Sequence, residues 1–134
     1  MQLPKNTTVA VADGTKFHLF RNTGDEAHPK LTALPEPAIG GDNKGAGARH
    51  ASSAANPDDS RLEEDSFAAA MADWLNNEVL SHRIDHLVVV AAPKALGELR
   101  KHYHKALQGK LLGELAKDLT GHPVADIEAA LVKG

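Results

Sequence analysis

Residues 40–50, GGDNKGAGARH, combine glycines and cations in a way that suits the binding of an anion. Glycine leaves backbone N–H groups open to a ligand, and lysine and arginine supply positive charge, which Asp42 partly offsets here. The binding residues that this pattern predicts are Gly40, Gly41, Lys44, Gly47, Arg49 and His50. The alternative interpretation is a surface loop with no function of its own.

A second group of cations follows Pro93 and gives the helix predicted there a basic outer face. Its members are Lys94, Arg100, Lys101, Lys105 and Lys110, with His102 and His104 among them. Such a face can contact RNA phosphates, and the binding then weakens as the salt concentration rises. A charge run of this kind is more often the solvated surface of a helix. We assign a binding role to Arg100 and Lys101.

The sequence lacks the residue patterns of several common catalytic and metal sites. Cysteine is absent, which excludes a thiolate nucleophile and a zinc-thiolate site. His82 and His86 lie four residues apart without the glutamate of a zinc-protease motif. No serine lies in a nucleophile-elbow motif. We therefore expect no metal and no cofactor, and on balance no enzymatic activity.

The position of Asp13 suits either metal binding or the formation of a turn. A carboxylate at the end of a strand can bind a divalent metal, but it needs partner acids, and the apolar stretch HLVVVAA at 86–92 offers none. Asp13 precedes Gly14, and Asp-Gly is a strong signal for a hairpin turn. The better interpretation of Asp13 is a turn-forming residue.

Composition indicates a single globular domain over residues 1–134. Hydrophobic residues make up 42% of the chain and charged residues 25%, which is typical of a protein with a packed core. The formal net charge of -3 gives no overall attraction to nucleic acid, so RNA binding requires a local patch. The chain begins without a basic and apolar signal sequence, and its longest apolar run, 87–92, is far too short to span a bilayer. We expect a cytoplasmic protein that does not enter the membrane.

The elements that must position these residues follow from hydrophobic periodicity. Short β-rich stretches at 7–14, 15–21 and 30–37 predict an antiparallel meander. A glycine-rich loop at about 38–57 separates the meander from a helix that ends near Leu80. The remaining elements that we expect are a buried strand at 86–92, a helix from Pro93 to Gly109, a strand at 110–119, where helix propensity is nearly as high, and a helix over 124–132. The predicted fold class is α/β, with a mixed five-stranded sheet and the order βββαβαβα.

Several stretches resemble a bacterial family known as the host attachment proteins, described as required for attachment to host cells. They are VADGTKFHLF, GAGARHASS, EEDSFAAAMADWLN and, most specifically, APKALGELRKHYHKAL and ELAKDLT. The resemblance covers nearly the whole chain. That family is in turn similar to the middle domain of archaeal and eukaryotic peptide-chain release factors. The resemblance therefore implies a ribonuclease-H-like α/β fold.

In the release-factor middle domain, the loop between the third strand and the first long helix carries Gly-Gly-Gln, which positions water on the peptidyl-tRNA ester. The corresponding residues here are Gly40, Gly41 and Asp42, and Gly-Gly-Gln occurs nowhere in the chain. An aspartate in place of the neutral amide is repelled by RNA phosphates. The resemblance thus implies the scaffold of a release factor without its catalytic motif.

Two hypotheses for function follow. The first is a non-enzymatic binding module that contacts the ribosome, tRNA or another protein through the glycine-rich loop and the basic helix. The second is a release-factor-like hydrolase that acts on peptidyl-tRNA or another ester. The missing catalytic pattern favours the first hypothesis. The sequence does not indicate the oligomeric state.

Overall fold

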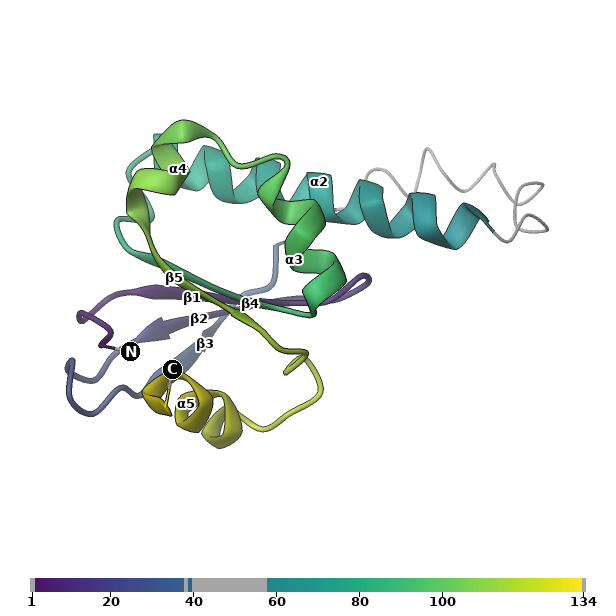
Figure 1. Ribbon diagram of the computed structural model, residues 1–134. Helices are drawn as coiled ribbons and strands as arrows, with labels where there is room; N and C mark the ends of the chain where they lie inside the picture. Colours follow the sequence, from purple (N-terminus) through teal and green to yellow (C-terminus); the bar gives the residue numbers. More distant parts are fainter. Residues whose placement is uncertain (1, 38, 40–57, 134) are drawn as a thin grey trace.

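A five-stranded sheet lies between two helical layers in the computed structural model, which describes residues 2–37, 39 and 58–133 (Figure 1). Its strands are β1 (Thr8–Ala12), β2 (Phe17–Asn22), β3 (Leu31–Leu34), β4 (Leu87–Ala91) and β5 (Leu111–Ala116). The strand order is β3-β2-β1-β4-β5. The β1–β2 and β2–β3 pairs are antiparallel, while β1–β4 and β4–β5 are parallel. This arrangement confirms the predicted meander and the mixed sheet.

Among the described elements, three helices cover one face of the sheet and one covers the other (Figure 1). The first group is α2 (Asp58–Leu80), α3 (Pro93–Arg100) and α4 (Lys105–Lys110), and the opposite face carries α5 (Val124–Lys133). Among the residues that the structure describes, no helix has an apolar stretch long enough to cross a bilayer. The predicted glycine-rich loop at 38–57 lies outside the described residues, apart from Ile39.

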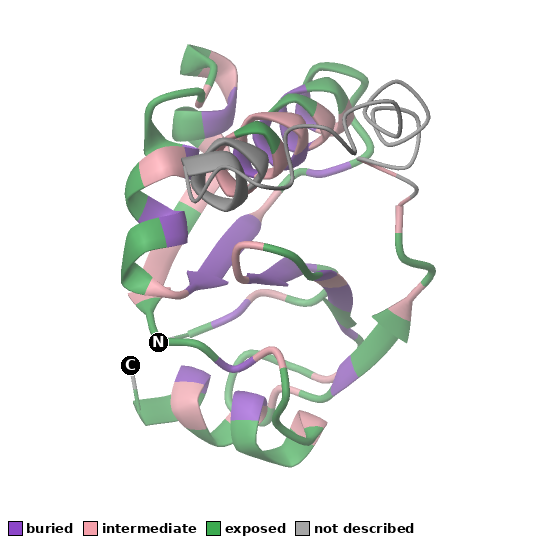
Figure 2. Ribbon diagram, turned by 90° about the vertical axis from the view of Figure 1, so that its right-hand side faces the viewer, coloured by how far each residue is buried: buried purple, intermediate pink, exposed green. Residues whose placement is uncertain are grey.

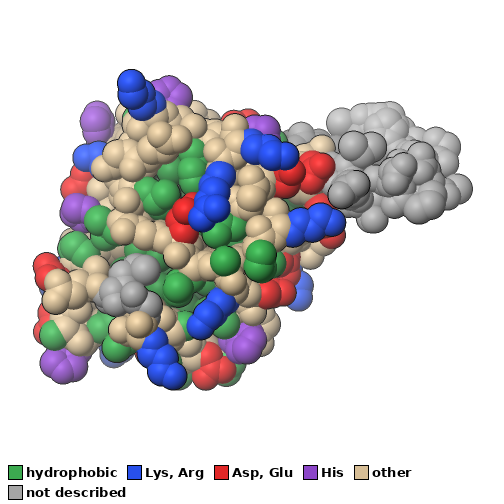
Figure 3. Space-filling view, viewed as in Figure 1, with side chains coloured by type: hydrophobic (Ala, Val, Ile, Leu, Met, Phe, Trp, Pro, Cys, Tyr) green, Lys and Arg blue, Asp and Glu red, His purple; other side chains and the backbone are tan. Residues whose placement is uncertain are grey.

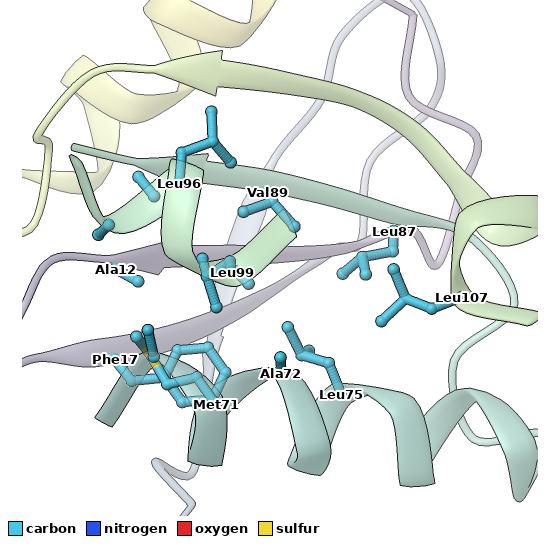
Figure 4. Close-up of a cluster of buried hydrophobic side chains, with 14 of the residues drawn as sticks. Ala12, Phe17, Met71, Ala72, Leu75, Leu87, Val89, Leu96, Leu99 and Leu107 are labelled. Atoms are coloured by element: carbon cyan, nitrogen blue, oxygen red, sulfur yellow. The ribbon is translucent and has the colours of Figure 1, made fainter. Parts of the chain in front are cut away.

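The core has two sides because β4 is buried on both of its faces (Figure 2). Val89 packs on the side of α2, α3 and α4, together with Met71 and Leu99 (Figure 4). Val88 packs on the opposite side, with Ile127 and the other apolar residues of α5. An uninterrupted apolar strand is expected where helices cover both faces of a sheet, so its sequence predicts its central position.

The predicted helix from Pro93 to Gly109 is wrong in one respect, because the structure divides it into α3 and α4. The amide of Asn76, on α2, accepts a hydrogen bond from the His104 N–H (2.9 Å) and donates one to the His102 carbonyl (2.9 Å). The backbone between the helices is therefore bonded to α2 instead of continuing a helical ladder. His104 then caps α4, with its Nδ1 accepting from the Ala106 N–H at 3.1 Å.

Candidate functional site at the carboxyl edge of the sheet

A crevice of about 300 Å³ opens where the parallel strands end. The carboxyl ends of β1, β4 and β5 lie at the same edge of the sheet, because all three strands run in one direction. After β1 the chain turns toward β2, whereas after β4 it leads toward β5 on the other side. Such a divergence is the place where open α/β sheets most often bind ligands. We therefore take this crevice as the candidate functional site.

Ionisable residues from four segments line the crevice. Asp13 follows β1, Lys94 and Glu98 belong to α3, and Asp118 follows β5. Glu64 and Asp65 come from α2. Five carboxylates thus surround one lysine, and the charge of the crevice disfavours a phosphate or another anion. The described residues nevertheless contain no group of three or more His, Cys, Asp or Glu side chains arranged to hold a metal ion.

Asp13 organises the turn that forms one wall of the crevice. Its Oδ1 accepts hydrogen bonds from the N–H groups of Thr15 (2.7 Å) and Lys16 (2.6 Å), and its own N–H donates to the Lys16 carbonyl. Burial raises the pKa of Asp13, but the hydrogen bonds from Thr15, Thr120 and Lys16 lower it more, so the pKa lies below its ordinary value of 3.8. Asp13 is therefore an ionised carboxylate with several donors, which confirms the turn-forming role.

Thr120 joins two of the carboxylates. Its hydroxyl lies 2.9 Å from Asp13 Oδ2 and 2.8 Å from Asp118 Oδ1. A hydroxyl has a single proton, so Thr120 can donate to only one of the two acids at a time. The contact ties the turn after β1 to the segment after β5, and it keeps both carboxylates beside the crevice.

Gly14 allows Glu64 to reach into the crevice from α2. A Cβ atom at position 14 would lie 2.8 Å from Glu64 Cδ and 2.9 Å from Glu64 Cγ, closer than side chains normally approach. Gly14 therefore has two roles. It forms part of the Asp-Gly turn, and it leaves the space that the Glu64 side chain occupies.

The structure brings together few of the residues that the sequence pointed to. Six of the predicted binding residues, Gly40, Gly41, Lys44, Gly47, Arg49 and His50, lie outside the described residues. Arg100 and Lys101 are described, and neither lines the crevice. Their role in binding stays a prediction.

Arg100 and Lys101 each form an ion pair with a glutamate. Arg100 donates to Glu114 Oε1 through Nε (3.0 Å) and Nη2 (2.8 Å), and Lys101 Nζ lies 2.8 Å from Glu98 Oε1. The Tyr103 hydroxyl donates to the other oxygen of Glu114 at 3.1 Å, and burial together with the charge of Glu114 raises the pKa of Tyr103. The basic face predicted from the sequence is thus partly neutralised by acids.

Sequence reasoning did not single out most of the residues that line the crevice. Glu64, Asp65, Lys94, Glu98 and Asp118 all fall within the stretches that carry the family resemblance. The available signal was the position of two of these stretches, since APKALGELRKHYHKAL begins and ELAKDLT ends at the carboxyl end of a predicted strand. β4 is apolar and supplies no acid to the crevice. The acids that accompany Asp13 come from α2, α3 and the segment after β5.

Comparison with known proteins identifies the family. Residues 6–131 match the sequence profile of bacterial archaeo-eukaryotic release factor family 12. No curated protein matches the chain. The match confirms the relation to release factors, while the host attachment name is not supported by it. With all but the ends of its sequence covered, the chain belongs to bacterial archaeo-eukaryotic release factor family 12.

Proposed function

We propose that this protein is a release-factor-like binding module that contacts the ribosome or tRNA without catalysing peptide release. The observation that carries the proposal is the family match over residues 6–131, combined with Gly40-Gly41-Asp42 in the segment between β3 and α2. By resemblance, this segment corresponds to the loop that carries Gly-Gly-Gln in release factors. A module that keeps the scaffold and lacks the glutamine would bind the same kind of partner.

The charges of the described residues indicate that the acidic crevice and the exposed cations outside it would have different roles. The carboxylates of the crevice would repel RNA phosphates, so RNA contact would fall to cations elsewhere. Arg100 and Lys101 keep 57% and 66% of their side chains exposed despite their ion pairs. Exposed ion pairs contribute little stability, so these cations could exchange a glutamate for a phosphate at small cost. Lys44 and Arg49 of the segment after β3 would add to this contact.

Co-sedimentation with ribosomal particles at low and raised salt tests the proposal. We expect binding that weakens as salt rises, because cations that neutralise phosphates release counterions. The double substitution Lys44→Ala and Arg49→Ala, and separately Arg100→Ala with Lys101→Ala, should weaken binding. Lys133→Ala, on α5 across the sheet, is the matched control and should leave binding unchanged. Absence of co-sedimentation at either salt, with no binding to tRNA, would exclude a role in translation.

A hydrolase of peptidyl-tRNA or another ester is the alternative, supported by the same family match. It predicts turnover that is lost when residues 40–50 are deleted or when Arg49 is replaced by alanine. Binding without turnover of peptidyl-tRNA would favour the non-enzymatic module.

A further inference from the structure

The two edge strands of the sheet differ in how they are closed. β3 has four residues, and the N–H of Leu31 donates to Glu128 Oε2 on α5 at 2.7 Å. Pro35 and Pro37 follow the strand directly and cannot donate to an added neighbour. This edge is blocked against further pairing, which is how soluble proteins commonly protect an edge strand.

β5 is open by comparison. It has six residues, and in the described part of the chain no group forms a hydrogen bond with the backbone atoms of 112–116 that point away from β4. Leu112 is the extra residue of a bulge, since Leu87 lies opposite Leu111 and Val88 opposite Gly113. The side chain of Leu112 is 43% exposed. In Figure 3, which views the molecule from the same side as Figure 1, hydrophobic side chains lie near the middle of the face, with adjacent acidic and basic side chains among them.

We propose that β5 pairs with the β5 strand of a second copy of this chain, antiparallel and about a twofold axis near Glu114. Self-complementary pairing of this kind is the usual form of a symmetric dimer interface. It would join the two sheets into one and satisfy the open backbone groups of both edge strands. Leu112 would lie opposite Ala116 of the partner subunit, which removes the exposed leucine from water.

The charges next to the two ends of β5 favour a second copy of this chain as the partner of the strand. Lys110, at the end of α4, precedes β5, and Asp118 follows it, each four residues from Glu114. Antiparallel pairing about Glu114 would therefore bring each Lys110 close to Asp118 of the partner subunit. The pair occurs twice because of the symmetry. Lys110 now contacts Asp85 at 3.0 Å in an exposed ion pair, which it can exchange at little cost.

The like charges at the axis are already balanced. Each Glu114 accepts hydrogen bonds from Arg100 on one oxygen and from Tyr103 on the other. Arg100 is 57% exposed, so its guanidinium can also face the Glu114 of the partner subunit. Two arginines and two glutamates at the axis form a neutral group.

Sedimentation velocity of the full chain, from micromolar to millimolar concentration, tests the proposal. We expect a reversible monomer–dimer equilibrium. Leu112→Lys should raise the dissociation constant at least about tenfold by bringing a charge into the pairing edge. Leu80→Lys, which changes a leucine of similar exposure on α2, is the matched control and should leave the equilibrium unchanged.

A charge exchange distinguishes this register from other modes of association. Lys110→Asp and Asp118→Lys should each weaken the dimer, and the double variant should restore it, with circular dichroism confirming that each variant is folded. A wild-type chain that stays monomeric at millimolar concentration overturns the proposal, even if β5 binds an added peptide strand. A dimer that is insensitive to Leu112→Lys also overturns it.

Discussion

Asp13 shows, at the scale of a single residue, how one carboxylate can hold several segments together. It bonds to the backbone of its own turn and to the Thr120 hydroxyl, which comes from 107 residues further along the chain. The sequence predicts the local half of this role, because Asp-Gly is a turn signal. It cannot predict the contact with Thr120, which depends on β5 ending beside β4 and on the path of the chain after it.

The pKa of Asp13 leads to a test by pH. Its folded-state pKa is lowered, so its contribution to stability is present above the unfolded value of 3.8 and is lost as the pH falls through the folded value. We expect Asp13→Asn to reduce the free energy of unfolding by about 1 kcal/mol at neutral pH, with a difference that shrinks in acid. Urea unfolding across the pH range measures this. Asp73→Asn, at an exposed position of α2, should have almost no effect, and a difference that grows on acidification would contradict the assignment.

At the scale of elements, the hydrophobic pattern predicts which face of a strand or helix is buried. It does not predict a helix break that depends on a residue of another element. The alternation of Phe17, Leu19 and Phe20 in β2 assigns these side chains to the correct faces of the sheet. Apolar residues at helical spacing likewise predict the inner face of α2, and two of them, Met71 and Leu75, are buried in the structure. The break between α3 and α4 is missed, because the residue responsible, Asn76, lies on another helix and looks like any polar residue in the sequence.

Replacing Asn76 tests whether this amide causes the break. Asn76→Ala removes the partner of both the His104 N–H and the His102 carbonyl, and we expect a loss of about 2 kcal/mol in the free energy of unfolding. Asn77→Ala is the control, because Asn77 is exposed and its neighbour is buried. Amide hydrogen exchange should show faster exchange at Ala106 in the first variant alone. Equal effects of the two substitutions would mean that Asn76 does not hold the segment.

At the scale of the whole molecule, both sides of the core share the central strand β4, so we expect them to unfold as one cooperative unit. Val89 contributes to the α2 side and Val88 to the α5 side, and both have no exposed surface. The overall α/β architecture could be predicted because most strands and helices carry a local hydrophobic pattern of their own. The crevice could not, since it is formed by residues that are polar, separated in the sequence and assembled only by the strand order.

Paired core substitutions measure this cooperativity. Val88→Ala and Val89→Ala should each lower the free energy of unfolding by about 2–3 kcal/mol, through lost burial and the cavity left behind. Each variant should unfold in one transition with coincident far- and near-ultraviolet circular dichroism signals. Separate transitions for the two probes in either variant would show that the helical layers unfold independently.

The central position of β1 in the sheet has a consequence for folding during synthesis. β1 leaves the ribosome before the other four described strands, and its parallel neighbour begins only at Leu87. Chains emerge from the amino end, so the meander is complete while one side of β1 still lacks its neighbour. An unpaired strand is a template for association with other chains. The interval between the synthesis of Ala12 and that of Ala91 is therefore when a nascent chain of this sequence most needs protection from aggregation.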